Sequence, residues 1–175
     1  MKKLVNDYIT DVLAEKRSEF GGKAVCPFAK PELDSGKLMI ASIGDKSLGQ
    51  LIDEFHLSNY ESALFIIKED VPAEQTQKFQ IFVNKVLKAK GLKQYKNICF
   101  NPNDQVAVDG YNPRSKAPYF MVNIAHRDVL LSAQQALQKT GYYDRLPEDY
   151  KKFLKLSNKS KINKWNPFIT IKVYL

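Results

Sequence analysis

The sequence predicts an α/β protein that forms a single domain over residues 1–175. Two observations carry this prediction: short apolar runs have the length of strands, and amphipathic segments of helical period separate them. The runs lie at residues 38–43, 62–67, 97–100 and 119–125. Strands separated by helices favour crossover connections. We therefore expect a mixed, mostly parallel sheet flanked by helices, with a two-layer sandwich as the alternative.

Amphipathic helices are expected before, between and after these strands. Residues 1–20 form the first, because apolar residues recur there at helical spacing up to a pair of glycines. Ser47 begins the second, with Gln50 three residues on in the pattern of a capping box. The others run over residues 72–91, opened by a proline, and residues 128–141, capped by an aspartate. A glycine closes both.

The net charge of +8 is concentrated at the C-terminal end of the chain. Residues 145–175 hold eight basic and two acidic residues, whereas the preceding 144 residues hold nineteen basic and seventeen acidic ones. With no helix-turn-helix or RNA-binding motif, this distribution argues against a nucleic-acid-binding protein. We expect a basic C-terminal extension over residues 145–175 that ends in an edge strand at residues 169–175.

The first residues have the character of a cytoplasmic protein rather than a secreted one. Asp7, Asp11 and Glu15 interrupt the stretch that would be apolar in a signal peptide. No apolar run approaches the roughly 20 residues that a membrane-spanning helix needs. Two cysteines, Cys26 and Cys99, provide no disulfide framework. We therefore expect a cytoplasmic chain that does not enter a membrane.

Cys26 is the first candidate for chemistry. Two prolines, Pro27 and Pro31, predict that the segment around it has no regular structure. A thiolate on such a stiff backbone could be presented to a soft metal or to a haem iron. The alternative is a small buried hydrophobic residue at a tight corner, which is the commoner role of a free cysteine. The residues alone leave both open.

His126 is the second candidate. It stands at the carboxyl end of an apolar strand and just before a helix, where open α/β sheets bind ligands. A neutral imidazole there can ligate a metal or transfer a proton. The alternative is a histidine hydrogen-bonded to a backbone carbonyl in the turn between strand and helix. His56, near the end of a helix, is best explained by the helix dipole.

A polar loop before the last apolar strand is the third candidate. Residues 102–117 carry no pattern of helix or strand, and long loops in compact domains are often functional. Arg114 and Lys116 could pair there with carboxylates or phosphates. A solvated surface excursion is the alternative. Phosphate loops, dinucleotide fingerprints, nucleophile elbows and zinc-finger spacings are absent from the sequence.

Residues 26–29 (CPFA), 100–102 (FNP) and 114–126 (RSKAPYFMVNIAH) together resemble an uncharacterised bacterial family. In that family a CPFA segment is followed by an F-H-P segment and then by an N-R-S-P-Y-P segment. Two departures are visible in this chain. Asn101 stands in place of the family's histidine, and residues 116–117 are an insertion before the proline.

More distantly, the order of segments resembles the haem-dependent N-hydroxylase family of the guanitoxin pathway. That family combines an early Pro-Cys segment, a histidine-proline segment with arginines, and a strand ending in Asn-x-His. A helix ending near Gly-x-Tyr follows. The counterparts here are Cys26, Asn101-Pro102, Arg114, Asn123 with His126, and Gly141-Tyr142. The cysteine and proline are in reversed order, the middle histidine is missing, and the Asn-to-His spacing is one residue longer.

The resemblance implies a haem-binding oxidoreductase, an oxygenase or N-hydroxylase, that acts on a small nitrogen-containing substrate. His126 or alternatively Cys26 would ligate the iron, and Arg114, Lys116 or Arg127 would hold the propionates. Two other functions remain open. One is a non-catalytic module that docks an anionic partner through its Lys-rich tail. The other is a cofactor-free enzyme in which His126 activates the Cys26 thiolate. The haem-binding hypothesis and the cofactor-free enzyme hypothesis both need Cys26 and His126 to border one cavity.

Overall fold

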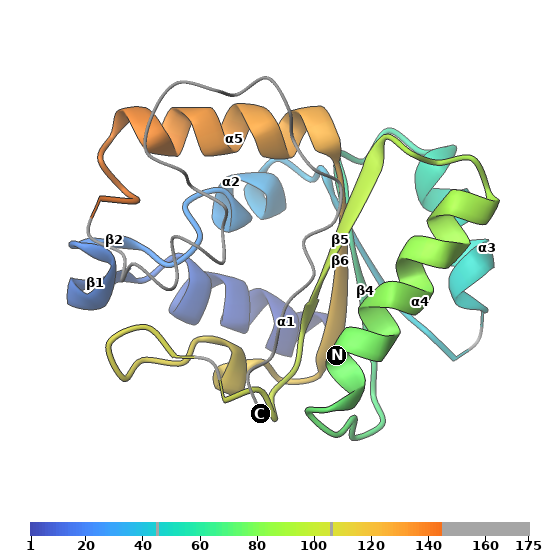
Figure 1. Cartoon of the computed structure of the whole chain (residues 1–175), viewed down its shortest axis with the longest axis horizontal. Coiled ribbons are helices and arrows are strands. Elements are labelled where there is room, and N and C mark those ends of the chain that lie inside the picture. The colour runs from blue at the N-terminus through green and yellow to red at the C-terminus, as the bar shows by residue number, and fades with distance from the viewer. Residues whose placement is uncertain (45, 106, 145–175) are drawn as a thin grey trace.

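The computed structural model describes residues 1–44, 46–105 and 107–144, which form one α/β domain (Figure 1). Residues 145–175, with the expected basic extension and edge strand, lie outside the described residues. The helices and strands are α1 (Lys2–Tyr8), β1 (Lys16–Arg17), β2 (Lys23–Ala24), α2 (Ala29–Asp34), β3 (Leu38–Ser42), α3 (Leu48–His56), β4 (Ser62–Ile67), α4 (Gln75–Ala89), β5 (Tyr95–Phe100), β6 (Phe120–His126) and α5 (Arg127–Lys139).

The main sheet is open and mixed, with the strand order β3-β4-β6-β5. Only β3 and β4 pair in parallel, whereas β6 is antiparallel to both of its neighbours. The expectation of a mostly parallel sheet is therefore wrong. The strands β3, β4 and β5 do run in one direction, as the helical crossovers between them require. The loop after β5 then returns the chain as β6, which inserts between β4 and β5 in the opposite direction.

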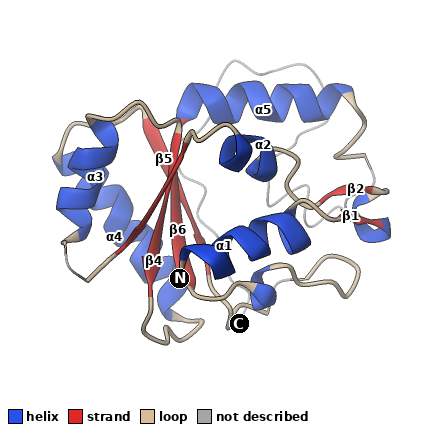
Figure 2. Ribbon diagram, turned by 180° about the vertical axis from the view of Figure 1, so that it is seen from behind, coloured by secondary structure: helices blue, strands red, loops and turns tan. Residues whose placement is uncertain are grey.

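Helices cover both faces of this sheet. The helices α3 and α4 lie on one face, and α1, α2 and α5 lie on the other (Figure 2). The domain therefore has three layers, and the alternative of a two-layer sandwich is wrong. Within the described residues, no helix is both long enough and apolar enough to cross a membrane.

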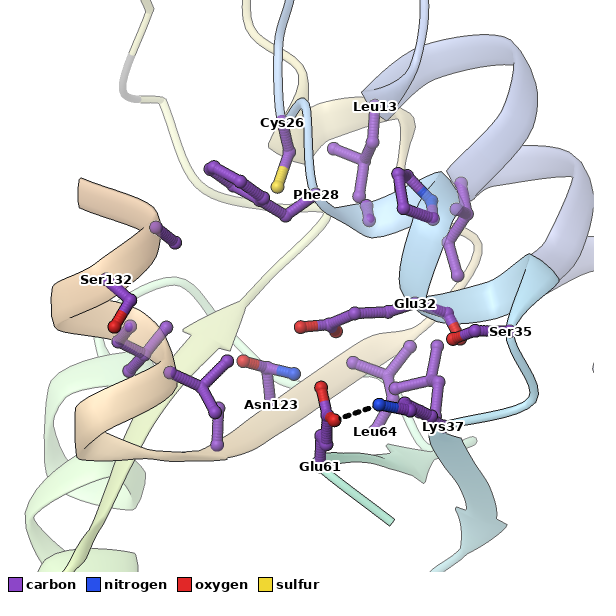
Figure 3. A pocket seen from close by; sticks show the side chains of 18 of the residues that line it. Leu13, Cys26, Phe28, Glu32, Ser35, Lys37, Glu61, Leu64, Asn123 and Ser132 are labelled. Carbon is purple, nitrogen blue, oxygen red and sulfur yellow. Dashed lines mark hydrogen bonds and ion pairs between the residues drawn. The ribbon is translucent and has the colours of Figure 1, made fainter. Parts of the chain in front are cut away.

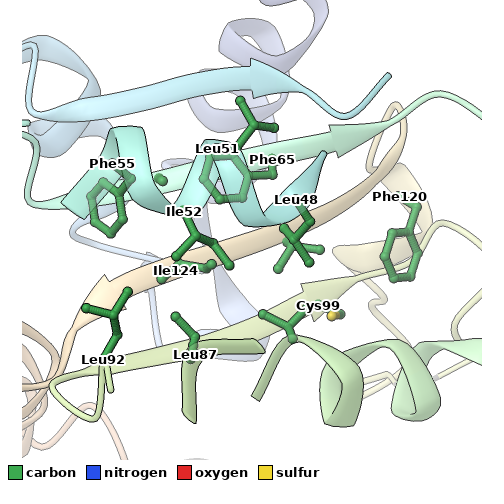
Figure 4. Packing of buried hydrophobic residues seen from close by; sticks show 13 residues of the cluster. Leu48, Leu51, Ile52, Phe55, Phe65, Leu87, Leu92, Cys99, Phe120 and Ile124 are labelled. Atoms are coloured by element: carbon green, nitrogen blue, oxygen red, sulfur yellow. The ribbon is translucent and has the colours of Figure 1, made fainter. Parts of the chain in front are cut away.

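The largest buried cluster lies between the sheet and the α3–α4 pair (Figure 4). Leu51, Ile52 and Phe55 form the inner stripe of α3, and each is at most 3% exposed. They meet alternate side chains of the strands, among them Phe65 and Ile124. This alternation follows from the period of two in a β-strand, which sends successive side chains to opposite faces. Val122 and Phe120 follow Ile124 on the same face of β6.

The N-terminal helix is shorter than the sequence predicts. The helix α1 continues into a π-helical turn over Ile9–Leu13 and ends there, rather than at residue 20. The next residues pair as the small antiparallel hairpin β1–β2. Gly21, with a φ of 67°, allows the left-handed conformation in the turn of this hairpin.

The first residues of three helices can be compared with the N-caps that the sequence predicts. The capping box is confirmed: the Ser47 hydroxyl accepts a hydrogen bond from the Gln50 N–H, and the Ser47 N–H donates to the Gln50 side chain. The fourth helix, α4, begins three residues after the proline at 72. The cap of α5 is His126 rather than Asp128, which lies in the first turn.

Candidate functional site

A partly open cavity of about 800 Å³ lies between α5, α2, the π-helical turn and one face of the main sheet. We call it the α5 cavity. Most of its wall is apolar. Ile9, Leu13, Phe28, Leu64, Val129 and Ala133 contribute side chains to it. A hollow of this size falls in the range of small-molecule sites.

The helix α5 forms one wall because its apolar stripe does not pack into the core. Val129, Leu130, Ala133 and Ala136 face the cavity, and no residue of α5 is fully buried. The stripe combines short side chains with a polar one, Ser132. An amphipathic helix normally buries its apolar stripe against the sheet. Here the stripe is available to a ligand instead.

A polar corner lies at the base of the cavity, beside the start of β4 (Figure 3). Glu32 reaches into it from α2 and accepts a hydrogen bond of 2.7 Å from the Ser62 hydroxyl. Ser62 is completely buried, so the sheet holds this donor in a fixed place. Lys37 and Glu61 form an ion pair next to it. Asn123, on β6, donates to the backbone carbonyl of Ala63.

The electrostatics of this corner are dominated by Glu32. Burial raises the pKa of its carboxyl group, and the nearby Glu61 raises it further, although the hydrogen bond from Ser62 opposes both. Among the described residues, no basic side chain forms an ion pair with Glu32. The corner therefore holds a carboxylate whose charge is only partly compensated.

Cys26 lies at the other end of the same cavity, and its sulfur points inward beside Phe28 (Figure 3). Burial raises the pKa of its thiol, and this outweighs the backbone N–H groups of Phe28 and Ala29, which lower it. Of the two residues expected to border a common cavity, Cys26 is therefore the one that lines the α5 cavity. The same burial disfavours the thiolate that a nucleophile or a metal ligand needs.

His126 does not border the α5 cavity. Phe120, Val122 and Ile124 project toward α3 and α4, so the period of two places His126 on that face as well. Its ring packs edge-on against Tyr95 at 5.5 Å, and its Nδ1 lies 3.9 Å from a carboxylate oxygen of Asp128. Cys26 and His126 are thus on opposite faces of the sheet, and the expectation of one common cavity is wrong.

The direction of β6 sets the edge of the sheet at which His126 lies, whereas the side-chain alternation sets its face. The ligand rule for α/β sheets refers to the carboxyl ends of parallel strands. Because β6 is reversed, its carboxyl end lies beside the amino ends of its neighbours: His126 pairs with Tyr95, the first residue of β5, and Ala125 pairs with Ser62, the first residue of β4.

The three cations expected at a cofactor are held elsewhere. Arg114 forms a short ion pair of 2.6 Å with Asp104 inside the polar loop. Lys116 lies over the ring of Tyr111, with its nitrogen 5.0 Å from the ring centre. Arg127 donates to the backbone carbonyl of Lys93. None of the three is on the wall of the α5 cavity.

The residues of the α5 cavity do not fit haem. The two carboxylate arms of that cofactor would lie in a cavity that already has Glu32, Glu61 and Asp128 on its wall. Lys37, the basic side chain that the described part of the wall contributes, is paired with Glu61. Separately, within the ranges that the structure describes, no three histidine, cysteine or acidic side chains are grouped to hold a bare metal ion, a requirement that does not apply to haem iron. We therefore derive no chemistry through haem.

Sequence reasoning missed Glu32 because it treated the surrounding segment as irregular. The helix α2 begins at Ala29 and contains Pro31 in its first turn. Proline is tolerated there because the first N–H groups of a helix have no intrahelical partner. One signal was available: Asn123 interrupts an otherwise apolar strand, and a polar residue in such a run marks a place where the sheet contacts something polar.

Comparison with known proteins identifies no relative: no protein-family model, curated protein or solved structure matches the chain. The family resemblance carried by residues 26–29 and 114–126 therefore stays a prediction.

Proposed function

We propose that the chain binds a small, mostly apolar molecule in the α5 cavity. The observation that carries this proposal is the unpacked stripe of α5: Val129, Leu130 and Ala133 face a hollow of about 800 Å³ instead of the core. An empty apolar cavity costs stability, because its walls lose packing contacts. A ligand that fills it recovers those contacts and about 0.8 kcal/mol for each CH₂ group that leaves water.

The arrangement of the wall supports a site with orientation. Apolar side chains from α5 and the π-helical turn cover most of the sides, whereas the hydrogen-bonding groups of α2 and the sheet gather at the corner around Glu32 and Asn123. Small-molecule sites commonly combine an apolar wall with a few polar groups that fix the ligand's direction. A ligand in the α5 cavity would direct its polar end toward the start of β4.

A cavity-filling substitution tests the proposal. Ala133→Trp places a large side chain in the hollow, while Gln135→Trp places the same side chain on the exposed side of α5 and serves as the matched control. The measurement is fluorescence of a neutral, environment-sensitive dye such as Nile red. We expect the wild-type chain and Gln135→Trp to bind the dye and Ala133→Trp to lose at least tenfold in affinity. Equal binding by all three chains, or none by the wild-type chain, would overturn the proposal.

Haem binding stays a separate prediction, in which Cys26 is the one expected ligand that borders the cavity. An absorption spectrum of protein expressed with a haem precursor decides it. A Soret band that Cys26→Ala abolishes would place haem in the α5 cavity. It would contradict our argument that Glu32, Glu61 and Asp128 repel the carboxylate arms of haem.

A further inference from the structure

We infer that the ligand of the α5 cavity carries a protonated nitrogen, an alkylammonium group, that the Glu32 carboxylate binds. This inference rests on the proposed small-molecule site and names the chemical class of its ligand. It is carried by the placement of the Glu32 carboxylate in a mostly apolar hollow and by the charged and hydrogen-bonding groups around it.

The charge of the wall favours a cation. Among the residues that the structure describes, the acidic side chains on it are Glu32, Glu61 and Asp128, and the basic one is Lys37. Since Lys37 is already paired with Glu61, its charge is not available to a ligand anion. A carboxylate or phosphate group in the cavity would meet repulsion, whereas a cation would be attracted.

Hydrogen bonding at the corner also favours a donor rather than an acceptor. The Ser62 hydroxyl uses its one proton on Glu32, at 2.7 Å. The Asn123 amide nitrogen donates to the carbonyl of Ala63, so that its oxygen remains to accept. Figure 3 shows this amide beside the Glu32 carboxylate. An ammonium group has three N–H donors and no acceptor, which complements such a corner.

The position of Glu32 makes this charge useful for recognition. Ser62 is fully buried and fixes the carboxylate, so a ligand need not order it on binding. Partial burial also weakens solvent screening, and charge-assisted hydrogen bonds are stronger than neutral ones. The hydrocarbon part of the ligand would then lie along the stripe of α5.

Three probes with one eight-carbon chain test the inference: octylammonium, octan-1-ol and octanoate, at pH 7. Displacement of Nile red from the full chain gives their affinities. We expect octylammonium to bind roughly tenfold more tightly than octan-1-ol, which is the advantage of one hydrogen bond to a charged group. Octanoate should bind most weakly of the three.

Two variants locate the effect. Glu32→Gln keeps the shape of the side chain and should reduce the affinity ratio of octylammonium to octan-1-ol to about one, with octan-1-ol unchanged. Asp34→Asn removes the same charge from an exposed position of α2 that is not on the cavity wall, and should keep the full ratio. Circular dichroism confirms folding, and Glu32→Asp, with a shorter reach, should lower the ratio if Glu32→Gln does not fold.

The outcomes separate this inference from the proposed function. If octan-1-ol displaces the dye as well as octylammonium does, or if Glu32→Gln retains the preference, the ammonium inference is wrong while the small-molecule site stands. If none of the probes displaces a bound dye and the dye binds Ala133→Trp normally, the site itself is wrong, and the inference with it.

Discussion

Glu32 is the residue on which the account of the site depends. Its carboxyl group lies in a partly buried corner, next to Glu61 and without an ion pair among the described residues. Ionisable groups whose charged form is disfavoured by burial are common at functional sites, because the bound ligand compensates the desolvation cost that the free protein carries. Ser62 reduces this cost and holds the group in place.

The first prediction concerns Glu32→Gln and pH. The raised pKa means that the folded state binds the proton more tightly than the unfolded state does. The protonated Glu32 therefore contributes its full stabilisation at pH values below its unfolded-state pKa of about 4.3. This contribution is lost as the pH rises through the folded-state pKa. Glu32→Gln should raise the free energy of unfolding relative to the wild-type chain at pH 7, and less so near pH 4. Urea unfolding at both values measures this, and a pH-independent difference would contradict it.

The second prediction concerns the reactivity of Cys26. Because burial raises the pKa of its thiol, iodoacetamide should label it more slowly than free cysteine at pH 7, and faster as the pH rises. Cys99 is an internal control: it is 1% exposed and its pKa is raised to about 12, so it should react more slowly still. Peptide mass spectrometry follows both. Rapid labelling of Cys26 at neutral pH would restore a nucleophilic role, but without His126 as its base.

At the scale of elements, the sequence predicted what is local and missed what is not. The runs at 38–43 and 62–67 are strands, and the capping box at Ser47 is present, because both depend on neighbouring residues. The direction of β6 depends on how a long loop returns the chain, which no local pattern encodes. The face of β6 to which His126 projects is likewise set by the packing of the whole sheet, and this face separates His126 from Cys26 and removes the site that the sequence predicted.

The candidate site was harder to predict than the fold. Cys26 was singled out and does border the cavity, but Glu32 was missed, because Pro27 and Pro31 suggested irregular structure in the segment that precedes it. The cavity exists because α5 stands away from the sheet, and a hydrophobic stripe in a sequence does not show whether it is packed or exposed to a hollow. Arg114 was singled out for an external anion and instead pairs with Asp104.

The third prediction tests an element that the sequence and the structure agree on. Ser47→Ala removes the hydroxyl that accepts the Gln50 N–H at the start of α3. The free energy of unfolding should fall by about 1 kcal/mol. Ser132→Ala, at an exposed position within α5, is a control with the same change of side chain and no N-cap to lose. Equal losses of unfolding free energy in the two variants, measured by urea unfolding, would show that the Ser47 hydroxyl does not stabilise α3.

At the scale of the whole molecule, the two faces of the sheet differ in how well they are filled. The face under α3 and α4 is packed as one cluster, in which Ile52 and Phe65 are fully buried. The other face has a smaller cluster around Val5 and Met121, beside the α5 cavity. One side of the sheet therefore carries much of the stability of the described domain, and the other offers space.

The fourth prediction compares the same substitution on these two faces. Leu51→Ala opens a new cavity in the packed cluster and should cost about 2–5 kcal/mol of unfolding free energy. Leu130→Ala, in α5, borders a space that is already hollow and should cost less than about 1 kcal/mol, because few packing contacts are lost. Urea unfolding of both variants checks the difference. A loss at Leu130 as large as at Leu51 would mean that the α5 stripe is packed.

The most direct test of the central claim is an NMR titration of the full chain with octylammonium, followed through the methyl signals. If a small molecule enters the α5 cavity, the signals of Ile9, Leu64 and Val129 on its wall should shift in a saturable manner. Those of Ile52 and Val83, on the α3–α4 face, should stay in place. Saturable shifts confined to the α3–α4 face, or none at millimolar probe, would contradict the account.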